Sequence, residues 1–225
     1  MALGFFFGFS QAQANEWIAP SGHPLTPLLK AALGHEQQLP VRQARTAQAL
    51  FAACPALELI IDGSERPIRR PKDAQRQKKF YSGKKKRHTV KNIVITDKRT
   101  KKIKVLSPTS EGKKQDKTLA DEQAYTFPKG TKLWKDTGFQ GYEPLDVTTF
   151  QPTKKPKGRA LTAQQKADNR TIAQQRIGVE HSLGGVKVFR IVSEVLRNFR
   201  DGFADTVILI ACGLHNFRLD HRAIA

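Results

Sequence analysis

The order in which extended and helical segments follow one another constrains most strongly what this chain can fold into. Between residues 51 and 135, short runs of β-forming residues alternate with Gly, Pro and Ser, a pattern typical of strands joined by turns. From Leu161 to Phe217 the pattern is helical, with expected interruptions at Gly184-Gly185, Asp201-Gly202 and Gly213. Strands followed by helices predict an α/β fold with one central sheet.

Individual strands are predicted from short apolar runs. Leu57–Ile61 is predicted to be a strand that ends at Asp62, and Thr131–Lys135 one that ends at Asp136. Further strands are expected over Phe80–Tyr81, His88–Thr96 and Ile103–Leu106, and a helix over residues 113–124.

The positive charge is concentrated in one segment. The chain has 225 residues, with 39 Lys plus Arg against 20 Asp plus Glu and a net charge of +19. Residues 66–104 alone hold 17 Lys or Arg and two acids. Because β-formers interrupt this basic segment throughout, a folded basic sheet is favoured over a disordered tail. Such a surface indicates a polyanionic partner.

Two aspartates stand in the same local setting. Asp62 and Asp136 each follow an apolar strand, and Gly63 and Gly138 follow them closely. Since glycine lets the backbone turn sharply, both carboxylates could face one cleft and hold a hard divalent cation. Asp before Gly is also ordinary turn chemistry, so the pattern alone leaves a turn role open. For the other candidate carboxylates a surface or capping role is preferred; these are Glu65, Asp97, Asp116 and Asp146.

A charged stripe is predicted on one face of the C-terminal helical region. Arg176, Glu180 and Lys187 are separated by four and then seven positions. At about 100° per residue, an α-helix places all three within about 40° of one another. Two cations beside one acid would suit a metal ligand flanked by phosphate-binding groups, although a solvated face explains the spacing too. A break at Gly184-Gly185 would remove Lys187 from the stripe.

At these residues the chain resembles the DDE transposases of bacterial insertion sequences, in particular the family-five elements and their Harbinger-like cousins. The similarity covers about residue 51 to the C-terminus. It rests on Asp62-Gly63, the stretch from Phe80 to Thr89, Lys135-Asp136-Thr137-Gly138-Phe139-Gln140-Gly141 and the R-x3-E-x6-K pattern of Arg176, Glu180 and Lys187.

The resemblance implies a ribonuclease-H-like mixed sheet flanked by helices. It also implies that Asp62, Asp136 and Glu180 are catalytic and bind two Mg²⁺ ions, with Mn²⁺ able to substitute. The expected substrate is double-stranded DNA, as terminal inverted repeats and target DNA, with a homodimer conceivable in the DNA complex. The DNA-binding residues we expect are Lys84, Lys85, Lys86, Arg87, Arg176 and Lys187.

The expected organisation is a partial helix-turn-helix-like helical segment over residues 1–50 and a DDE catalytic domain over 51–225. A short helix ending at Ile18 and a second over Leu25–Leu33 would form the first segment. A complete helix-turn-helix is normal in the family, so we expect an N-terminally truncated copy. A second departure is Ala173, which stands where the family usually has a tyrosine.

Two other functions stay open at this point. The chain could be a non-catalytic, DNA-binding remnant of a transposase, or a ribonuclease-H-like host nuclease. The R-x3-E-x6-K pattern argues against the second. No apolar stretch approaches the length that spans a bilayer, and Cys54 and Cys212 lack ligand spacing, so we expect a cytoplasmic, nucleoid-associated protein with buried thiols.

Overall fold

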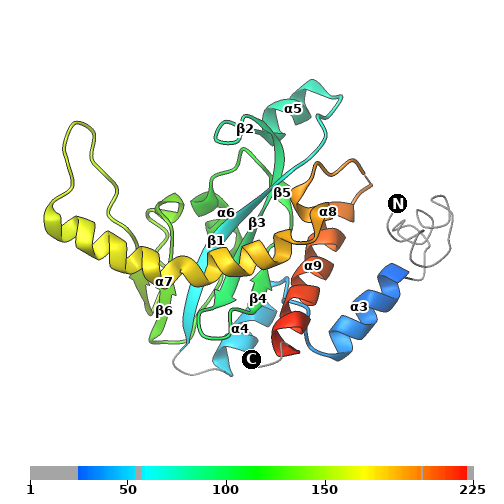
Figure 1. The fold of residues 1–225 in the computed structure, drawn as a ribbon, viewed down its shortest axis with the longest axis horizontal. Helices are drawn as coiled ribbons and strands as arrows, with labels where there is room; N and C mark the ends of the chain where they lie inside the picture. The colour runs from blue at the N-terminus through cyan, green and yellow to red at the C-terminus, as the bar shows by residue number, and fades with distance from the viewer. Residues whose placement is uncertain (1–24, 54–56, 199, 222–225) are drawn as a thin grey trace.

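The computed structural model describes residues 25–53, 57–198 and 200–221, which form a mixed sheet flanked by helices (Figure 1). The strands are β1 (Glu58–Pro67), β2 (Tyr81–Ser82), β3 (Arg87–Asp97), β4 (Ile103–Leu106), β5 (Ser110–Glu111), β6 (Thr131–Trp134) and β7 (Val147–Phe150). The helices are α3 (Leu25–His35), α4 (Ala44–Ala52), α5 (Ala74–Phe80), α6 (Asp116–Gln123), α7 (Ala163–Lys187), α8 (Arg190–Ser193) and α9 (Phe203–Asp220), with a 3₁₀ turn η1 (Thr137–Phe139). The predicted helix ending at Ile18, and Cys54, lie outside the described residues.

The sheet has the order β2-β3-β1-β6-β7, with β4 and β5 also paired to β3. Strand β1 runs antiparallel to β3 and parallel to β6, and β6 runs parallel to β7. A parallel pair cannot be joined by a tight hairpin, so the segment between β1 and β6 returns through the β3–β5 region and α6. This mixed sheet flanked by helices confirms the expected α/β, ribonuclease-H-like architecture.

Each face of the sheet packs against a different set of helices. Ile60 and Trp134 point to one face, which α7, α8 and α9 cover, and Figure 1 shows α7 crossing in front of the sheet. Ile61 and Leu133 point to the opposite face, where residues of α4 and α6 complete a second core. Successive residues of a strand face opposite sides, so each central strand contributes to both cores. None of the helices in the described ranges is long and apolar enough to cross a membrane.

Several elements differ from their predicted bounds, and tertiary contacts explain most of the differences. Strand β1 continues past Asp62 because β3 pairs with it as far as Pro67. Phe80 ends α5 instead of starting a strand, and β7 was not predicted. Helix α7 is continuous through Gly184-Gly185 because α9 packs against it there, and a Cβ on Gly185 would collide with the ring of His215. Helix α9 likewise continues through Gly213.

Residues 38–52 pack directly onto the sheet and α9. Val41 forms a parallel bridge with Val105, and the side chain of Asn216 on α9 donates to the backbone oxygen of Gln38 at 2.8 Å. Ala47 and Phe51 of α4 are completely or almost completely buried. The predicted helix at Leu25–Leu33 is confirmed as α3, which packs against α9. The division of the chain near residue 50 stays a prediction.

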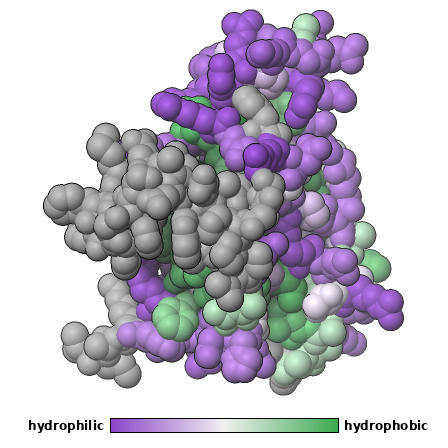
Figure 2. All heavy atoms as spheres, turned by 90° about the vertical axis from the view of Figure 1, so that its right-hand side faces the viewer, coloured by the Kyte–Doolittle hydropathy of each residue, from purple (hydrophilic) through white to green (hydrophobic). Residues whose placement is uncertain are grey.

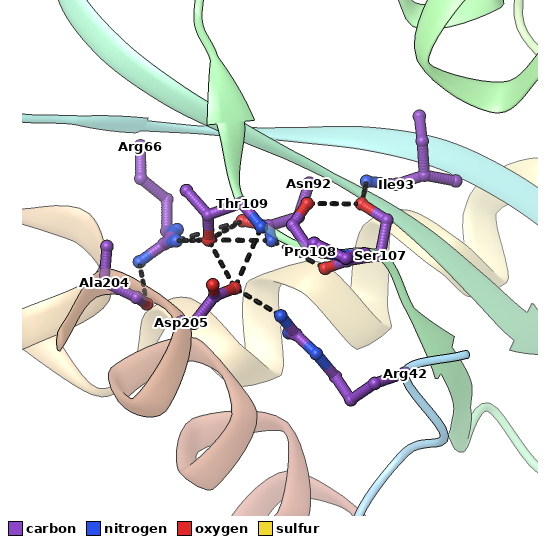
Figure 3. A network of polar contacts seen from close by, with 9 residues as sticks. All are labelled: Arg42, Arg66, Asn92, Ile93, Ser107, Pro108, Thr109, Ala204 and Asp205. Carbon is purple, nitrogen blue, oxygen red and sulfur yellow. Dashed lines mark hydrogen bonds and ion pairs between the residues drawn. The ribbon is translucent and has the colours of Figure 1, made fainter. Parts of the chain in front are cut away.

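A polar network joins β1, β3 and the start of α9 (Figure 3). Arg66, only 2% exposed, donates to the side chain of Asn92 at 2.9 Å and to the backbone oxygen of Ala204 at 3.2 Å. Asp205 accepts hydrogen bonds from Arg42 and from both the N–H and the hydroxyl of Thr109. The network therefore links the segment before α4, the sheet and the last helix through charged groups.

Candidate functional site

Asp62 and Asp136 lie near the ends of two neighbouring parallel stretches of chain. Asp62 lies within β1, Asp136 lies two residues after the end of β6 and caps η1, and β1 and β6 pair up to Ile60 opposite Trp134. Paired strands are about 4.8 Å apart, and residues two positions apart face the same side. Both carboxylates therefore lie on the face that α7 covers.

The guanidinium of Arg176 on α7 contacts both aspartates. Its Nη2 lies 3.9 Å from Oδ1 of Asp62, and its Nη1 lies 3.6 Å from Oδ1 of Asp136. The arginine side chain is 11% exposed, so the contact is largely shielded from water. The sequence prediction gave Arg176 a phosphate-binding role; in the structure it also neutralises the aspartate pair.

The carboxyl group of Asp62 is held in an environment that disfavours its charge. Burial raises the pKa of Asp62 to about 6, and the nearby carboxylates of Asp136 and Asp116 act in the same direction. Arg176 and the N–H of Gly63, which donates to Asp62 Oδ1 at 2.8 Å, partly oppose this rise. A buried, partly compensated anion of this kind favours binding of an additional cation.

A third carboxylate, Asp116, lies beside the pair. It is the first residue of α6, and its Oδ1 forms an ion pair of 3.0 Å with Nζ of Lys91. Sequence reasoning preferred a surface or capping role for Asp116, whereas the structure places it against the backbone that follows each of the other two aspartates. Its position after the third long strand was the signal in the sequence, but a helix start gives the same signal.

Gly63 and Gly138 make room for Asp116. A Cβ on Gly63 would lie 2.6 Å from Asp116 Oδ1, and one on Gly138 would lie 2.8 Å from Asp116 Oδ2. The prediction that glycine permits a sharp turn is wrong for Gly63, because β1 runs through it. At Gly138 the backbone does turn, in η1, but neither glycine has a positive φ. The close approach of the Asp116 side chain explains why both positions are glycine.

We expect Gly138→Ala to lower the free energy of unfolding by about 1–3 kcal/mol, because the added methyl overpacks the space that Asp116 occupies. Urea unfolding would measure this. Gly184→Ala is the matched control, since nothing lies within 4 Å of its Cβ position and alanine favours a helix. Adding Asp116→Ala to Gly138→Ala should recover part of the loss; equal effects of the two glycine variants would contradict the explanation.

Glu180 lies one helical turn beyond Arg176 on the same helix. Four residues advance an α-helix by about 6 Å and return to within about 40° of the same direction. Glu180 is exposed, and in the described ranges no hydrogen bond or ion pair joins it to either aspartate. Within those ranges no three His, Cys, Asp or Glu side chains form a group that could hold a metal ion. The structure thus brings Asp62 and Asp136 together, and convergence of Glu180 with them stays a prediction.

Lys187 keeps the helical phase of the stripe but lies far from the aspartates. Because α7 is unbroken, Lys187 is about 20° round from Arg176, as predicted for a continuous helix. Eleven residues separate them, about 16 Å along the axis. A role for Lys187 would therefore concern a more distant part of a bound polymer.

Lys84, Lys85 and Lys86 lie in the turn between β2 and β3, Arg87 begins β3, and all four are exposed. The surrounding basic segment is folded and contains strands, as predicted, whereas the short helix α5 was not predicted. Figure 2 shows hydrophilic side chains covering the end of the molecule that α5 and β2 form. This surface offers positive charge beyond one end of the aspartate pair.

The donor chemistry of the aspartate pair suits a hard divalent cation. Carboxylate oxygens are the preferred ligands of Mg²⁺ and Mn²⁺. Asp62 is the buried member of the pair, and the guanidinium of Arg176 shows that the site already accommodates positive charge between the two carboxylates. The two aspartates therefore fit such an ion.

Comparison with known proteins adds a family to this geometry. Residues 61–216 match the family model described as DDE superfamily endonuclease. Over 165 residues the chain is 36% identical to the probable transposase for insertion sequence element IS702 of Microchaete diplosiphon, covering 73% of this chain and 58% of that protein. The chain thus spans a little over half the length of this relative. No solved structure matches the chain.

Proposed function

Because the chain belongs to the DDE superfamily of endonucleases, we propose that it cuts DNA strands in a metal-dependent reaction and joins them at the ends of an insertion sequence. One observation carries this proposal: a single guanidinium on α7, that of Arg176, contacts the carboxylates of both Asp62 and Asp136. This shared contact supports binding of a divalent ion between the two carboxylates.

The residues that would hold the metal are Asp62, Asp136 and Glu180. Bound Mg²⁺ or Mn²⁺ would activate a water or a DNA 3′-hydroxyl and would stabilise the leaving oxygen. Support for Glu180 comes from its place one turn from Arg176, on the flank of α7 that reaches the aspartates.

The other residues of the site have their own tasks. Arg176 would bind a phosphate oxygen of DNA when Asp62 and Asp136 hold a cation. Asp116 and Lys91 keep the backbone after both aspartates in place, since their ion pair lies against Gly63 and Gly138. The exposed cations at 84–87 and Lys187 would contact phosphates and add affinity without sequence preference.

We further propose terminal inverted repeats and target DNA as substrates, a homodimer in the DNA complex, and the cytoplasmic nucleoid as the place of the reaction. The catalytic unit would be residues 51–225, with a helix-turn-helix-like segment before it. Support comes from the matched relative, whose printed description is a probable transposase for an insertion sequence element.

Cleavage of supercoiled plasmid tests the proposed activity. We expect nicking in Mg²⁺, none in EDTA, and a rate at least about 100-fold lower in Glu180→Gln, equivalent to about 3 kcal/mol of barrier. Glu194→Gln is the control, since Glu194 is an exposed glutamate whose ion pair with Arg190 lies on α8. Binding without nicking would instead identify a DNA-binding remnant, and full activity in Glu180→Gln would remove Glu180 from the site.

A further inference from the structure

A groove lined by lysines lies next to the aspartate pair, on the side of Gly138. Its volume is about 470 Å³. The walls are the turn between β2 and β3, the loop between β5 and α6, and the segment after β7. Six lysines line this lysine groove: Lys84, Lys91, Lys113, Lys114, Lys117 and Lys154.

Half of these lysines have their charge compensated. Lys91 pairs with Asp116, Lys114 with Glu122 at 2.9 Å, and Lys117 with Asp121. The remaining three, which are Lys84, Lys113 and Lys154, are exposed and form no ion pair within the part of the chain that the structure describes. Glu65 also lines the groove and forms no ion pair in the described ranges, so it offsets one of these three charges and the groove keeps a net positive charge.

The groove reaches the backbone that follows Asp136. Thr137 and Gly138, which line it, are the two residues after Asp136, and the N–H of Thr137 donates to Asp136 Oδ1 at 2.6 Å. Asp116 also lines it while lying against Gly63 and Gly138. An anionic polymer that enters the groove would thus pass beside Asp136.

Hydrogen bonds fix the loop that carries Lys113 and Lys114. In the loop between β5 and α6, the N–H of Gly112 donates to the oxygen of Thr89 at 3.0 Å, and that of Lys113 donates to the oxygen of Lys79 at 3.2 Å. Nζ of Lys91 donates to the oxygen of Lys114 at 2.8 Å. Cations on a preformed wall bind an anion with a smaller loss of conformational entropy than cations on a free loop.

We propose that the lysine groove binds the phosphodiester backbone of the DNA strand that leads away from the scissile phosphate. The inference rests on the proposed function and adds to it the path of the substrate. Lysines without an acidic partner complement the negative charge of a DNA backbone, and they read no bases. Lys113 and Lys154, which the sequence did not single out, extend the surface that begins at Lys84.

The test is salt-dependent binding of a fluorescent 30-base-pair duplex to the full chain in EDTA, where no cleavage occurs. The groove variant is Lys113→Gln with Lys154→Gln. The control variant is Lys101→Gln with Lys129→Gln, which removes the same charge from two exposed lysines at the end of the sheet where β1 and β6 begin. We expect the slope of log affinity against log salt to become shallower by about 1.8 in the groove variant, since each phosphate contact contributes about 0.9.

Equal changes in the groove and control variants would overturn the proposal, because they would show a diffuse effect of net charge. An unchanged slope in the groove variant would overturn it as well. In both cases the proposed function stands if the parent protein still nicks plasmid in Mg²⁺. If the parent neither binds the duplex nor nicks plasmid, the proposed function fails together with the groove.

Discussion

Replacing Asp62 with asparagine is expected to stabilise the metal-free protein by roughly 3 kcal/mol above pH 7 while lowering Mg²⁺-dependent cleavage by about 1000-fold. The stability gain follows from the pKa of Asp62, which burial raises from 3.8 to about 6, at 1.36 kcal/mol per pKa unit. The loss of cleavage follows from removing a metal ligand whose contribution to the transition state is about 4 kcal/mol.

The sign of the pH dependence follows from proton binding in the two states. Between about pH 4 and 6 the folded protein keeps the proton of Asp62 while the unfolded chain releases it. The free energy of unfolding of the parent therefore falls as pH rises through this interval, and the full penalty is present above pH 6. Asparagine does not ionise, so this part of the pH dependence should disappear in Asp62→Asn.

Urea unfolding in EDTA at pH 4, 6 and 8 would measure the stability gain of Asp62→Asn and its dependence on pH. Asp168→Asn is the matched control, because Asp168 is an exposed aspartate on α7 that accepts a hydrogen bond from Gln164. We expect the control to follow the parent at every pH. A parent protein whose stability does not fall between pH 4 and 8 relative to Asp62→Asn would contradict a raised pKa.

Removing the carboxylate of Asp205 is expected to cost about 3 kcal/mol of stability. Asp205 accepts hydrogen bonds from Arg42 and Thr109, and these hold its pKa below the usual range although burial acts in the opposite direction. Asp205→Ala would leave Arg42 and the buried Arg66 without this nearby anion. Breaking a buried charged network costs about 3–5 kcal/mol, and the low end applies because 35% of the Asp205 side chain is exposed.

Asp121→Ala provides the comparison for Asp205→Ala. Asp121 pairs with Lys117 four residues earlier on the surface of α6, and exposed pairs of this kind contribute less than about 1 kcal/mol. Asp205→Asn should lie between the two, because it keeps an acceptor for Thr109 and loses the charge. Chemical denaturation of all three proteins would rank them, and similar losses in Asp205→Ala and Asp121→Ala would show that the network contributes little.

Local sequence patterns predicted the central strands of the sheet. The apolar run at 57–61 and the β-formers at 88–96 became the centre of the sheet, because burial on both faces requires apolar residues at successive positions. The continuity of α7 through Gly184-Gly185 could not be predicted, because the contact with His215 that uses Gly185 comes from 30 residues further along the chain.

The same distinction applies to the candidate site. Asp62 and Asp136 were found because each follows an apolar run, but their shared contact with Arg176 depends on the pairing of β1 with β6, which no local pattern encodes. Asp116 was ranked with the surface carboxylates, because only the folded chain sets it between Gly63 and Gly138. The lysine groove was missed for a similar reason, since Lys113 and Lys154 come from loops separated by β6 and β7.

The anchoring of residues 38–52 has a mechanical consequence. The bridge from Val41 to Val105 and the hydrogen bond from Asn216 to Gln38 attach this segment to the rigid sheet and α9. A DNA-reading element joined to the chain before residue 38 would then be held at a constant distance from Asp62 and Asp136. Duplex DNA advances about 3.4 Å per base pair. A constant distance within the protein would therefore correspond to a constant number of base pairs between the sequence that is read and the bond that is cut.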